Sequence, residues 1–453
     1  MPFVSMNPAT GEAVREYPAM EAPECMDRID QAWPAFQEWS RLPLSERLEP
    51  VRALARLLET GIEHHAALIT RECGKPIRES RREVEDAVAL AHFLVAEAES
   101  ALQEHSPDPR SPGARTRPHP LGVILGIMPW NFPLLQPLRA ALPALVAGNA
   151  FLLKPASSTP ECALTLEALL QEAGVPRRCF QVLLADADTL SFAFVHAAIR
   201  GVAFTGSTEA GKRVAAAAGA QLKPCVLELG GSDPAIVLED ADLDQAVQGI
   251  VQGKLIHGGQ HCIATKRILA AQPIFPALRE RLINAFSAIP PADPTLPETR
   301  LGPLGQASQR EELHRQITSA IADGASLLCG GAIPDGTGFF YPLTLLEDVS
   351  PRMAISREEL FGPAAVLHSF QHEAEALALA NGSPFGLGAS IYTGDAVHAD
   401  RLASRLEVGL VYINAPVRSN PYLPFGGTKE SGYGRELGAD GIRSFTYQKV
   451  FHG

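Results

Sequence analysis

The 453-residue sequence lacks the marks of several special protein classes. Its seven cysteines include no CxxC pair and are spread along the chain, so we expect reduced thiols, no metal site and a cytoplasmic protein. The long apolar stretch 140–153 is interrupted by Pro143 and Asn149, and no basic segment followed by an apolar run opens the chain. We therefore expect neither export nor a membrane partner.

Positive charge is also scarce. Lysine and arginine number 39 against 51 acidic residues, which gives a formal net charge of −12. Because phosphate backbones are bound by clustered basic residues, a nucleic-acid partner is not expected. Hydrophobic residues make up 46% of the chain, without internal repeats or low-complexity tracts, so the sequence predicts a globular protein of about three typical domains.

The first hundred residues carry helical patterning. Apolar residues at three- to four-residue spacing predict a helix over 26–39, kinked or restarted at Pro34, and a second from about Ser45. A third helix is expected to end at Cys73, before Gly74, and a fourth to cover 78–102. Residues 105–120 are rich in proline, serine and arginine, which predicts an extended excursion.

From Gly122 onward, short apolar runs alternate with helical segments, and a second α/β unit follows the first. The expected strands are 122–128, 150–154, 179–184, 201–205, 225–229, 235–238 and 267–270, with further strand segments in 324–331, 386–393 and 409–413. This alternation predicts βαβ units and a parallel sheet covered on both faces, with ligands bound beyond the carboxyl ends of the strands. Residues 443–451 are expected to form an edge strand.

Two stretches carry candidate chemistry. Glu228 follows an apolar run and precedes a glycine pair, so it is expected as a rigidly held carboxylate at the end of a buried strand. Cys262 follows Gly258 and Gly259, which allow close approach of the backbone to a ligand. The pair is a candidate nucleophile and general base, although a single cysteine is more often a small buried hydrophobe.

A second pair of features points to a phosphate-bearing cofactor. Gly206 and Ser207 open the run GSTEAG at a strand-to-helix turn, where backbone N–H groups favour a pyrophosphate; the alternative is a helix cap without a ligand. Lys154 ends a strand before Pro155, where it would meet a ribose hydroxyl or a phosphate; the alternative is a solvated lysine.

Seven motifs stand along nearly the whole chain: PWNFP (129–133), LLKP (152–155), FTGS (204–207), LELGG (227–231), GQHC (259–262), EELFGP (358–363) and PFGG (424–427). In this order they resemble the aldehyde dehydrogenase superfamily. Three longer stretches, IMPWNFPLLQPLR (127–139), LELGGSDP (227–234) and RSNPYLPFGGTKESGYGREL (418–437), resemble its bacterial and cyanobacterial NAD(P)-dependent succinate-semialdehyde dehydrogenase branch. The resemblance implies an α/β fold with two parallel-sheet domains and a small β oligomerisation element. It implies a dinucleotide-binding domain at 1–105 and 126–230, a catalytic domain at 231–435, and an oligomerisation element at 106–125 and 436–453 of a homodimer or homotetramer.

The resemblance also implies a mechanism for oxidising an aldehyde. Cys262 would add to the carbonyl to give a thiohemiacetal, whose oxyanion the Asn131 amide and the Cys262 N–H stabilise. Hydride transfer to NAD(P) would leave a thioester, and Glu228 would activate the water that hydrolyses it. His261 adjoins the cysteine, but sequence neighbours rarely face each other, so we take it as incidental rather than as a Cys–His hydrolase pair.

The cofactor and substrate residues are carried over in the same way. The implied cofactor-binding residues are Trp130, Lys154, Ser157, Gly206, Ser207, Glu359 and Phe361. Many members of the family place a glutamate where this chain has Ser157, and a carboxylate would repel a 2′-phosphate, so we expect NADP to be accepted alongside NAD and to be the preferred cofactor. The implied substrate-binding residues are Arg139, Ser419, Trp130 and Phe425.

Arg139 carries the substrate prediction. It lies in an almost wholly apolar segment, and a buried guanidinium needs an anionic partner. That partner is either the distal carboxylate of succinate semialdehyde or a core aspartate or glutamate. Some members carry a second substrate arginine where this chain has Ile256, and a second cysteine where it has Ala264. The alternatives to the predicted function are a dehydrogenase of broad aliphatic or aromatic specificity and a non-catalytic scaffold that retains the fold.

Overall fold

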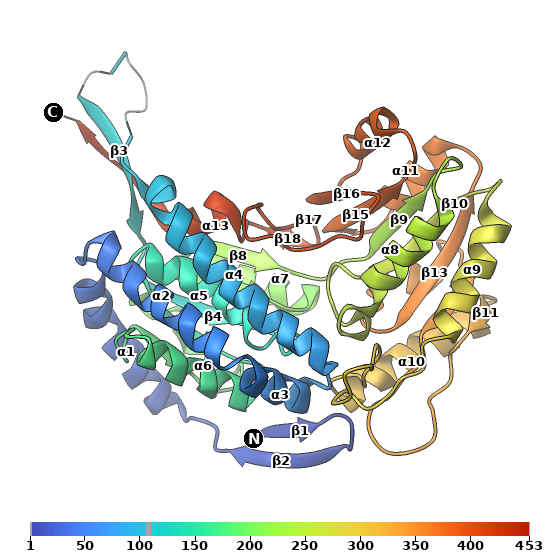
Figure 1. Ribbon diagram of the computed structural model, residues 1–453. Helices are drawn as coiled ribbons and strands as arrows, with labels where there is room; N and C mark the ends of the chain where they lie inside the picture. The colour runs from blue at the N-terminus through green and yellow to red at the C-terminus, as the bar shows by residue number, and fades with distance from the viewer. Residues whose placement is uncertain (1, 106–109, 112, 453) are drawn as a thin grey trace.

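The computed structural model describes residues 2–105, 110–111 and 113–452. Figure 1 shows two α/β lobes, with the N-terminal half of the chain in one and most of the C-terminal half in the other. A two-stranded arm projects from the first lobe. The predicted α/β class, with two lobes built on largely parallel sheets, is confirmed.

The first lobe is built on a six-stranded sheet. Its strand order is β18-β8-β7-β4-β5-β6, and all neighbours are parallel except β18, which pairs antiparallel with β8. The bounds are β4 Val123–Ile127, β5 Ala150–Lys154, β6 Phe180–Val182, β7 Ile199–Thr205, β8 Cys225–Glu228 and β18 Gly432–Tyr433. The five apolar runs expected as strands in this part of the chain are confirmed. Only β18, a two-residue strand from the far end of the sequence, was not expected.

Helices cover both faces of this sheet, as predicted, because successive strand side chains point in opposite directions. Val123 and Leu125 of β4 pack in the core cluster that includes α1, whereas Ile124 packs in the larger cluster beneath α2, α4 and α5. The helices are α1 Ala22–Trp39, α2 Leu44–Thr60, α3 Ile62–Cys73, α4 Ile77–Leu102, α5 Leu135–Val146, α6 Pro160–Glu172 and α7 Thr208–Gly219.

The four N-terminal helices lie close to the predicted ranges. α3 ends at Cys73 as expected, because Gly74 takes the left-handed conformation (φ 70°) that closes a helix. α1 does not restart at Pro34 but continues through it. Proline removes one helical hydrogen bond, and buried Ile29 and Trp39 on either side hold the helix against the sheet.

The second lobe is built on a seven-stranded sheet of order β11-β12-β13-β10-β9-β15-β16, parallel except for the edge pair β11-β12. Its strands are β9 Asp233–Val237, β10 Thr265–Ala271, β11 Ser326–Cys329, β12 Thr344–Glu347, β13 Ala364–Phe370, β15 Gly388–Tyr392 and β16 Leu410–Ile413. Its helices are α8 Leu243–Leu255, α9 Phe275–Ser287, α10 Ala307–Ala322, α11 Glu373–Asn381 and α12 Ala396–Ala403. A further short pair, β14 Phe385–Gly386 with β17 Thr428–Lys429, lies beside this sheet.

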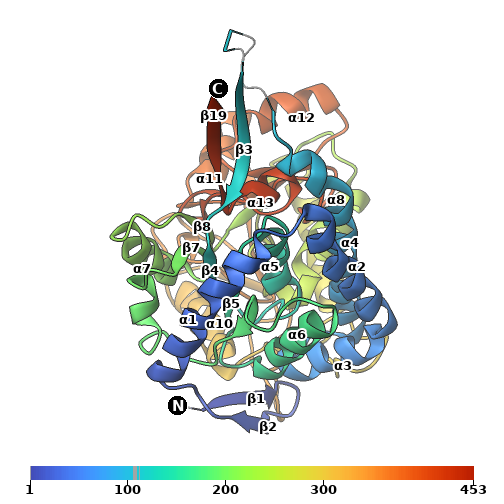
Figure 2. The same cartoon turned by 90° about the vertical axis from the view of Figure 1, so that its left-hand side faces the viewer.

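The arm and an N-terminal hairpin complete the fold. β3 (Ala114–Pro120) pairs antiparallel with β19 (Thr446–His452), which follows α13 (Gly438–Arg443), and Figures 1 and 2 show this pair standing off the first lobe. The expected edge strand is thereby confirmed; part of the expected excursion, 106–109 and 112, lies outside the described residues. The hairpin of β1 (Phe3–Asn7) and β2 (Glu12–Tyr17) was not predicted. Within the described residues, no helix is long and apolar enough to cross a bilayer.

Candidate active site

The loop that carries Cys262 has an unusual backbone. Between α8 and β10, three consecutive residues, His257, Gly258 and Gly259, have φ values of 47°, 59° and 76°. A Cβ on Gly259 would lie 2.1 Å from the carbonyl oxygen of Gly362, so only glycine fits there. The glycine pair before the cysteine is therefore a requirement of the loop itself.

The glycine pair after Glu228 is also required by close contacts with neighbouring atoms. A Cβ on Gly231 would lie 2.4 Å from the carbonyl oxygen of Cys262, and one on Gly230 would lie 2.5 Å from a carboxylate oxygen of Glu359. The end of β8 thus packs directly against the cysteine loop and against Glu359. Close backbone approach, which glycine alone permits, brings the two sequence motifs together.

These contacts surround a cavity of about 230 Å³ that holds most of the predicted site. Predicted residues that line it are Cys262, Glu228, Asn131, Trp130, Gly206, Ser207, Glu359, Phe361 and Arg139. Ser419 lines an adjoining cavity, and Phe425 is buried behind Arg139. Lys154 and Ser157 lie at the end of β5, outside the lining of either cavity.

Burial makes the Cys262 thiol a weak acid. Desolvation raises its pKa to about 12, and nearby Lys266 opposes that rise. The Lys266 ammonium is fully buried, donates to the carbonyl oxygen of Cys262 at 2.7 Å, and pairs with Glu359 at 2.8 Å. Sequence reasoning missed this lysine, although a charged residue inside the apolar run of β10 was a usable signal.

Burial also disfavours the charged form of Glu228. Its carboxyl group is buried, and neither oxygen has a hydrogen-bond partner in the described residues. Desolvation raises its pKa well above the ordinary value, the nearby carboxylate of Glu436 raises it further, and Arg139 opposes the rise. The carboxyl group therefore ionises only as the pH rises.

Asn131 is oriented by the cysteine loop. Its amide nitrogen donates to the carbonyl oxygen of Gln260 at 2.9 Å. The Gln260 side chain is itself fixed, because its oxygen accepts from the Gly305 N–H at 2.8 Å. An amide nitrogen has two N–H groups, so one remains for an oxyanion at Cys262. The Asn131 oxygen is buried and has no hydrogen-bond partner in the described residues.

Arg139 already faces a carboxylate. Its guanidinium lies 2.8 Å from Glu436, and both side chains are buried, with exposed fractions of 4% and 5%. It also lies over the Phe425 ring at 4.2 Å. The core partner considered above is thus present, and sequence reasoning did not single it out. Arg139 nevertheless lines both the cysteine cavity and the adjoining one, with a buried Nε that has no hydrogen-bond partner in the described residues.

The cofactor side of the cavity offers free polar groups. Ser207 caps α7 by accepting from the Ala210 N–H at 3.4 Å. The Thr205 hydroxyl beside it is buried without a hydrogen-bond partner in the described residues. A helix N-terminus and an orphaned hydroxyl suit an anionic, hydroxyl-rich ligand. Burial lowers the pKa of Lys154, whose ammonium donates to the carbonyl oxygen of Pro155 at 3.1 Å, and Ser157 is exposed.

The adjoining cavity, of about 530 Å³, meets the cysteine cavity through shared lining residues. The shared residues are Phe132, Gln136, Arg139 and His261. Ser419 and Ile256 belong to this outer cavity. Gly206 and Ser207 at the α7 terminus line the cysteine cavity and not the outer one.

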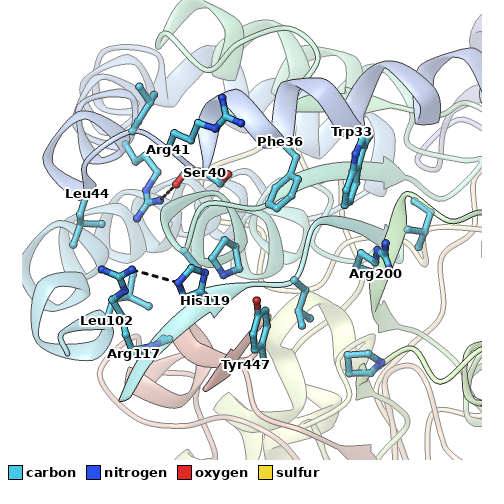
Figure 3. A pocket seen from close by; sticks show the side chains of 18 of the residues that line it. Trp33, Phe36, Ser40, Arg41, Leu44, Leu102, Arg117, His119, Arg200 and Tyr447 are labelled. Carbon is cyan, nitrogen blue, oxygen red and sulfur yellow. Dashed lines mark hydrogen bonds between the residues drawn. The ribbon is translucent and has the colours of Figure 1, made fainter. Parts of the chain in front are cut away.

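A larger cavity, of about 1440 Å³, lies elsewhere. Figure 3 shows Trp33 and Phe36 of α1, Arg117 and His119 of β3, and Tyr447 of β19 around it. It is bounded by the arm, and none of the predicted site residues lines it. The arrangement of the nucleophile therefore favours the smaller cavity as the active site. Within the described residues, no group of three or more His, Cys, Asp or Glu side chains is placed to hold a metal ion.

Comparison with known proteins agrees with this arrangement. Residues 2–451 match the sequence profile of the aldehyde dehydrogenase family. A succinate-semialdehyde dehydrogenase (NADP+) of Deinococcus radiodurans is 43% identical over 450 residues, covering 99% of this chain and 94% of the relative. A succinate semialdehyde dehydrogenase (NAD(P)+) of Escherichia coli is 41% identical, covering 98% and 96%. The structure of a Streptococcus pyogenes succinic semialdehyde dehydrogenase in complex with NADP+ superposes with a TM-score of 0.97 at 32% identity, covering 99% of both chains.

Proposed function

Because this chain belongs to the aldehyde dehydrogenase family and is therefore an aldehyde-oxidising enzyme, we propose that it converts succinate semialdehyde to succinate with NADP. Relatives of that name match nearly the whole chain at about 40% identity. The convergence of Cys262, Glu228 and Asn131 in one cavity carries the proposal, because it supplies a nucleophile, a base and an oxyanion donor together.

The first step belongs to Cys262. Its thiolate adds to the aldehyde carbon, and the negative charge moves to the aldehyde oxygen. The free N–H of the Asn131 amide and the backbone N–H of Cys262 are the donors we assign to that oxygen. When bound, the nicotinamide dinucleotide supplies the hydride acceptor that oxidises this adduct to a thioester on Cys262.

The second step belongs to Glu228. In its ionised form it takes a proton from the water that attacks the thioester carbon, and succinate leaves as the sulfur is released. Burial raises the pKa values of the Cys262 thiol and of the Glu228 carboxyl group, which favours their protonated forms. The reactive forms of both groups become more populated as the pH rises.

The cofactor residues are proposed on the fit of the cavity. Gly206 and Ser207 at the start of α7 would hold the phosphates, with Glu359 and Phe361 opposite them. Lys154 and exposed Ser157 would meet the adenosine ribose and its 2′-phosphate. NADP is the dinucleotide named for the D. radiodurans and S. pyogenes proteins, which supports the choice of NADP.

The substrate carboxylate is proposed to meet Arg139 and Ser419 in the outer cavity, with Trp130 and Phe425 as apolar neighbours. One observation favours a second candidate, a dehydrogenase of broad aldehyde specificity. Glu436 already neutralises Arg139, so this arginine alone gives less discrimination than a free one would.

Steady-state kinetics separate the two candidates. The substrates are succinate semialdehyde and butyraldehyde, which match in chain length and differ in charge, each followed by the absorbance of reduced cofactor. We expect kcat/KM to be at least about tenfold higher for succinate semialdehyde, and higher with NADP than with NAD. Equal values for the two aldehydes would establish the broad-specificity enzyme instead.

We also propose that the chain assembles with copies of itself through the β3–β19 arm, as a dimer or tetramer, and that it acts in the cytoplasm. The arm stands off the lobe, and Tyr447 and Val450 on it are exposed, which suits pairing with a second copy. Sedimentation of the whole chain, with and without Val450→Lys, tests the assembly; a monomeric wild type would contradict it.

A further inference from the structure

The outer cavity carries more positive charge than its own carboxylates balance. Its charged lining residues are Lys75, Arg78, Arg82, Arg139, Arg300 and Arg418 against Glu79, Glu83 and Asp86. Half of these cations are already paired, and the pairs are Lys75 with Glu83, Arg82 with Asp86, and Arg139 with Glu436. The remaining three arginines distinguish this cavity from an ordinary surface with charges of both signs.

Arg78, Arg300 and Arg418 have no carboxylate within ion-pair distance anywhere in the described part of the chain, and all three are exposed. One acid is left over, Glu79, whose pKa burial raises to about 7 and whose oxygen accepts from the His257 N–H. It interacts with Arg78, and a single carboxylate cannot balance three arginines. An excess of positive charge therefore persists at this opening at neutral pH.

The three arginines come from separate parts of the chain. Arg78 lies in the first turn of α4, Arg300 in the loop before α10, and Arg418 in the loop after β16. Their convergence on one opening stands out in a chain whose net charge is −12. A cleft lined by cations within an acidic protein concentrates small anions and speeds their capture.

Among the described residues, the inner part of the site offers no free cation. Ile256, which lines the outer cavity, carries no charge. Arg139 is held by Glu436, so the inner cavity has no cation without a carboxylate partner for a substrate carboxylate. The unpaired cations lie farther out, on other segments.

We propose that Arg78, Arg300 and Arg418 form an outer carboxylate subsite that selects aldehydes bearing a carboxylate at the far end of the chain. The subsite captures the incoming anion in the outer cavity. The anion then moves inward to Arg139, which lines both cavities, as its aldehyde end reaches Cys262. This inference rests on the proposed function, because it names the residues that give that function its substrate class.

The test compares the triple variant Arg78→Gln, Arg300→Gln, Arg418→Gln with the wild type. Arg82→Gln is the matched control, because Arg82 lines the same cavity but is paired with Asp86 at 2.9 Å. For each protein, kcat/KM is measured with succinate semialdehyde and with butyraldehyde at saturating NADP, at low and at moderate ionic strength. Inhibition of butyraldehyde oxidation by succinate gives a binding measurement that does not need turnover of the anion.

We expect the triple variant to lose about tenfold or more in kcat/KM for succinate semialdehyde and less than about twofold for butyraldehyde. Its inhibition constant for succinate should rise by a similar factor, and its salt dependence should flatten. The control should keep wild-type values. The proposal would be overturned if kcat/KM fell equally for both aldehydes, if it did not fall for either, or if Arg82→Gln lowered it as much as the triple variant does.

The same measurements distinguish a wrong substrate assignment from a wrong subsite. If the wild type itself oxidises both aldehydes equally, succinate semialdehyde is not its selected substrate. In that case the inhibition constant for succinate decides whether the subsite exists. An inhibition constant that rises about tenfold in the triple variant would support an anion subsite, and an unchanged inhibition constant would contradict it.

Discussion

At the scale of single residues, burial favours the neutral forms of the two groups that we propose to react. Burial raises the pKa of Cys262 to about 12 and that of Glu228 well above its ordinary value. A protein that stores both groups protonated avoids two buried charges in one small cavity. The consequence is that turnover should increase with pH, because both active forms are the deprotonated ones.

The first prediction concerns Glu436. Its charge is the second cause of the raised pKa of Glu228, after burial, so Glu436→Gln should lower that pKa. The rising limb of the kcat–pH profile should move toward lower pH by on the order of one unit. Glu347→Gln, whose carboxylate pairs with Arg279 in the second lobe, serves as control. An unmoved limb, or one moved to higher pH, would rule out Glu436 as a modulator.

At the scale of elements, the glycines around the nucleophile explain why the motifs have their spacing. Gly259 combines a φ of 76° with a Cβ position 2.1 Å from a carbonyl oxygen. The left-handed conformation alone costs an ordinary residue about 1–2 kcal/mol, and the clash adds to that. The loop therefore holds Cys262 in place through backbone contacts.

The second prediction uses two glycines that differ in their surroundings. Gly259→Ala should destabilise the protein by at least about 2 kcal/mol and reduce activity, since either the loop or residue 362 has to move. Gly219→Ala, at the end of α7 with nothing within 4 Å of its Cβ, should be neutral or stabilising by up to about 1 kcal/mol. Denaturant unfolding and kcat measure both; equal effects would contradict the steric account.

Some helices and strands could be predicted from the sequence, and others could not. Strands β4 to β8 and helices α2 to α4 were foreseen because their apolar periodicity is strong and glycine or proline marks their ends. The β1–β2 hairpin was missed, since five of the six β2 residues are exposed and show no alternation. β18 is two residues long, and no local pattern specifies a strand of that length.

The site residues also differ in how far the sequence could predict them. Sequence motifs located Cys262, Glu228 and Asn131, and the structure brings them to one cavity. The partnership of Arg139 with Glu436 depends on tertiary packing between distant segments, so the sequence could only state that some anion was needed. Lys266 was missed for a related reason, because its partner Glu359 lies on another loop.

At the scale of the whole molecule, the active-site cavity draws residues from both lobes. Gly206 and Ser207 belong to the sheet of the first lobe, whereas Glu359 and Phe361 precede β13 of the second. A dinucleotide bound as proposed would contact both lobes. Its binding should therefore stabilise the folded protein as a whole.

The third prediction follows from that linkage. At a concentration of about 100 times its Kd, NADP should add about 2.7 kcal/mol to the free energy of unfolding and raise Tm by a few degrees. NAD at the same concentration should raise Tm less. Ser157→Glu should reverse the order, because the new carboxylate repels the 2′-phosphate. A larger shift with NAD than with NADP in the wild type would contradict the cofactor assignment.

The central claim is that Cys262 forms a thioester with a carboxylate-bearing aldehyde and that Glu228 hydrolyses it. The most direct measurement is intact-protein and peptide mass spectrometry of Glu228→Gln after mixing with succinate semialdehyde and NADP. We predict one equivalent of reduced cofactor, a steady-state rate lowered by about 10²–10⁴, and a succinyl adduct on the peptide that contains Cys262. A variant that keeps turning over without an adduct, or an adduct on another cysteine, would contradict the account.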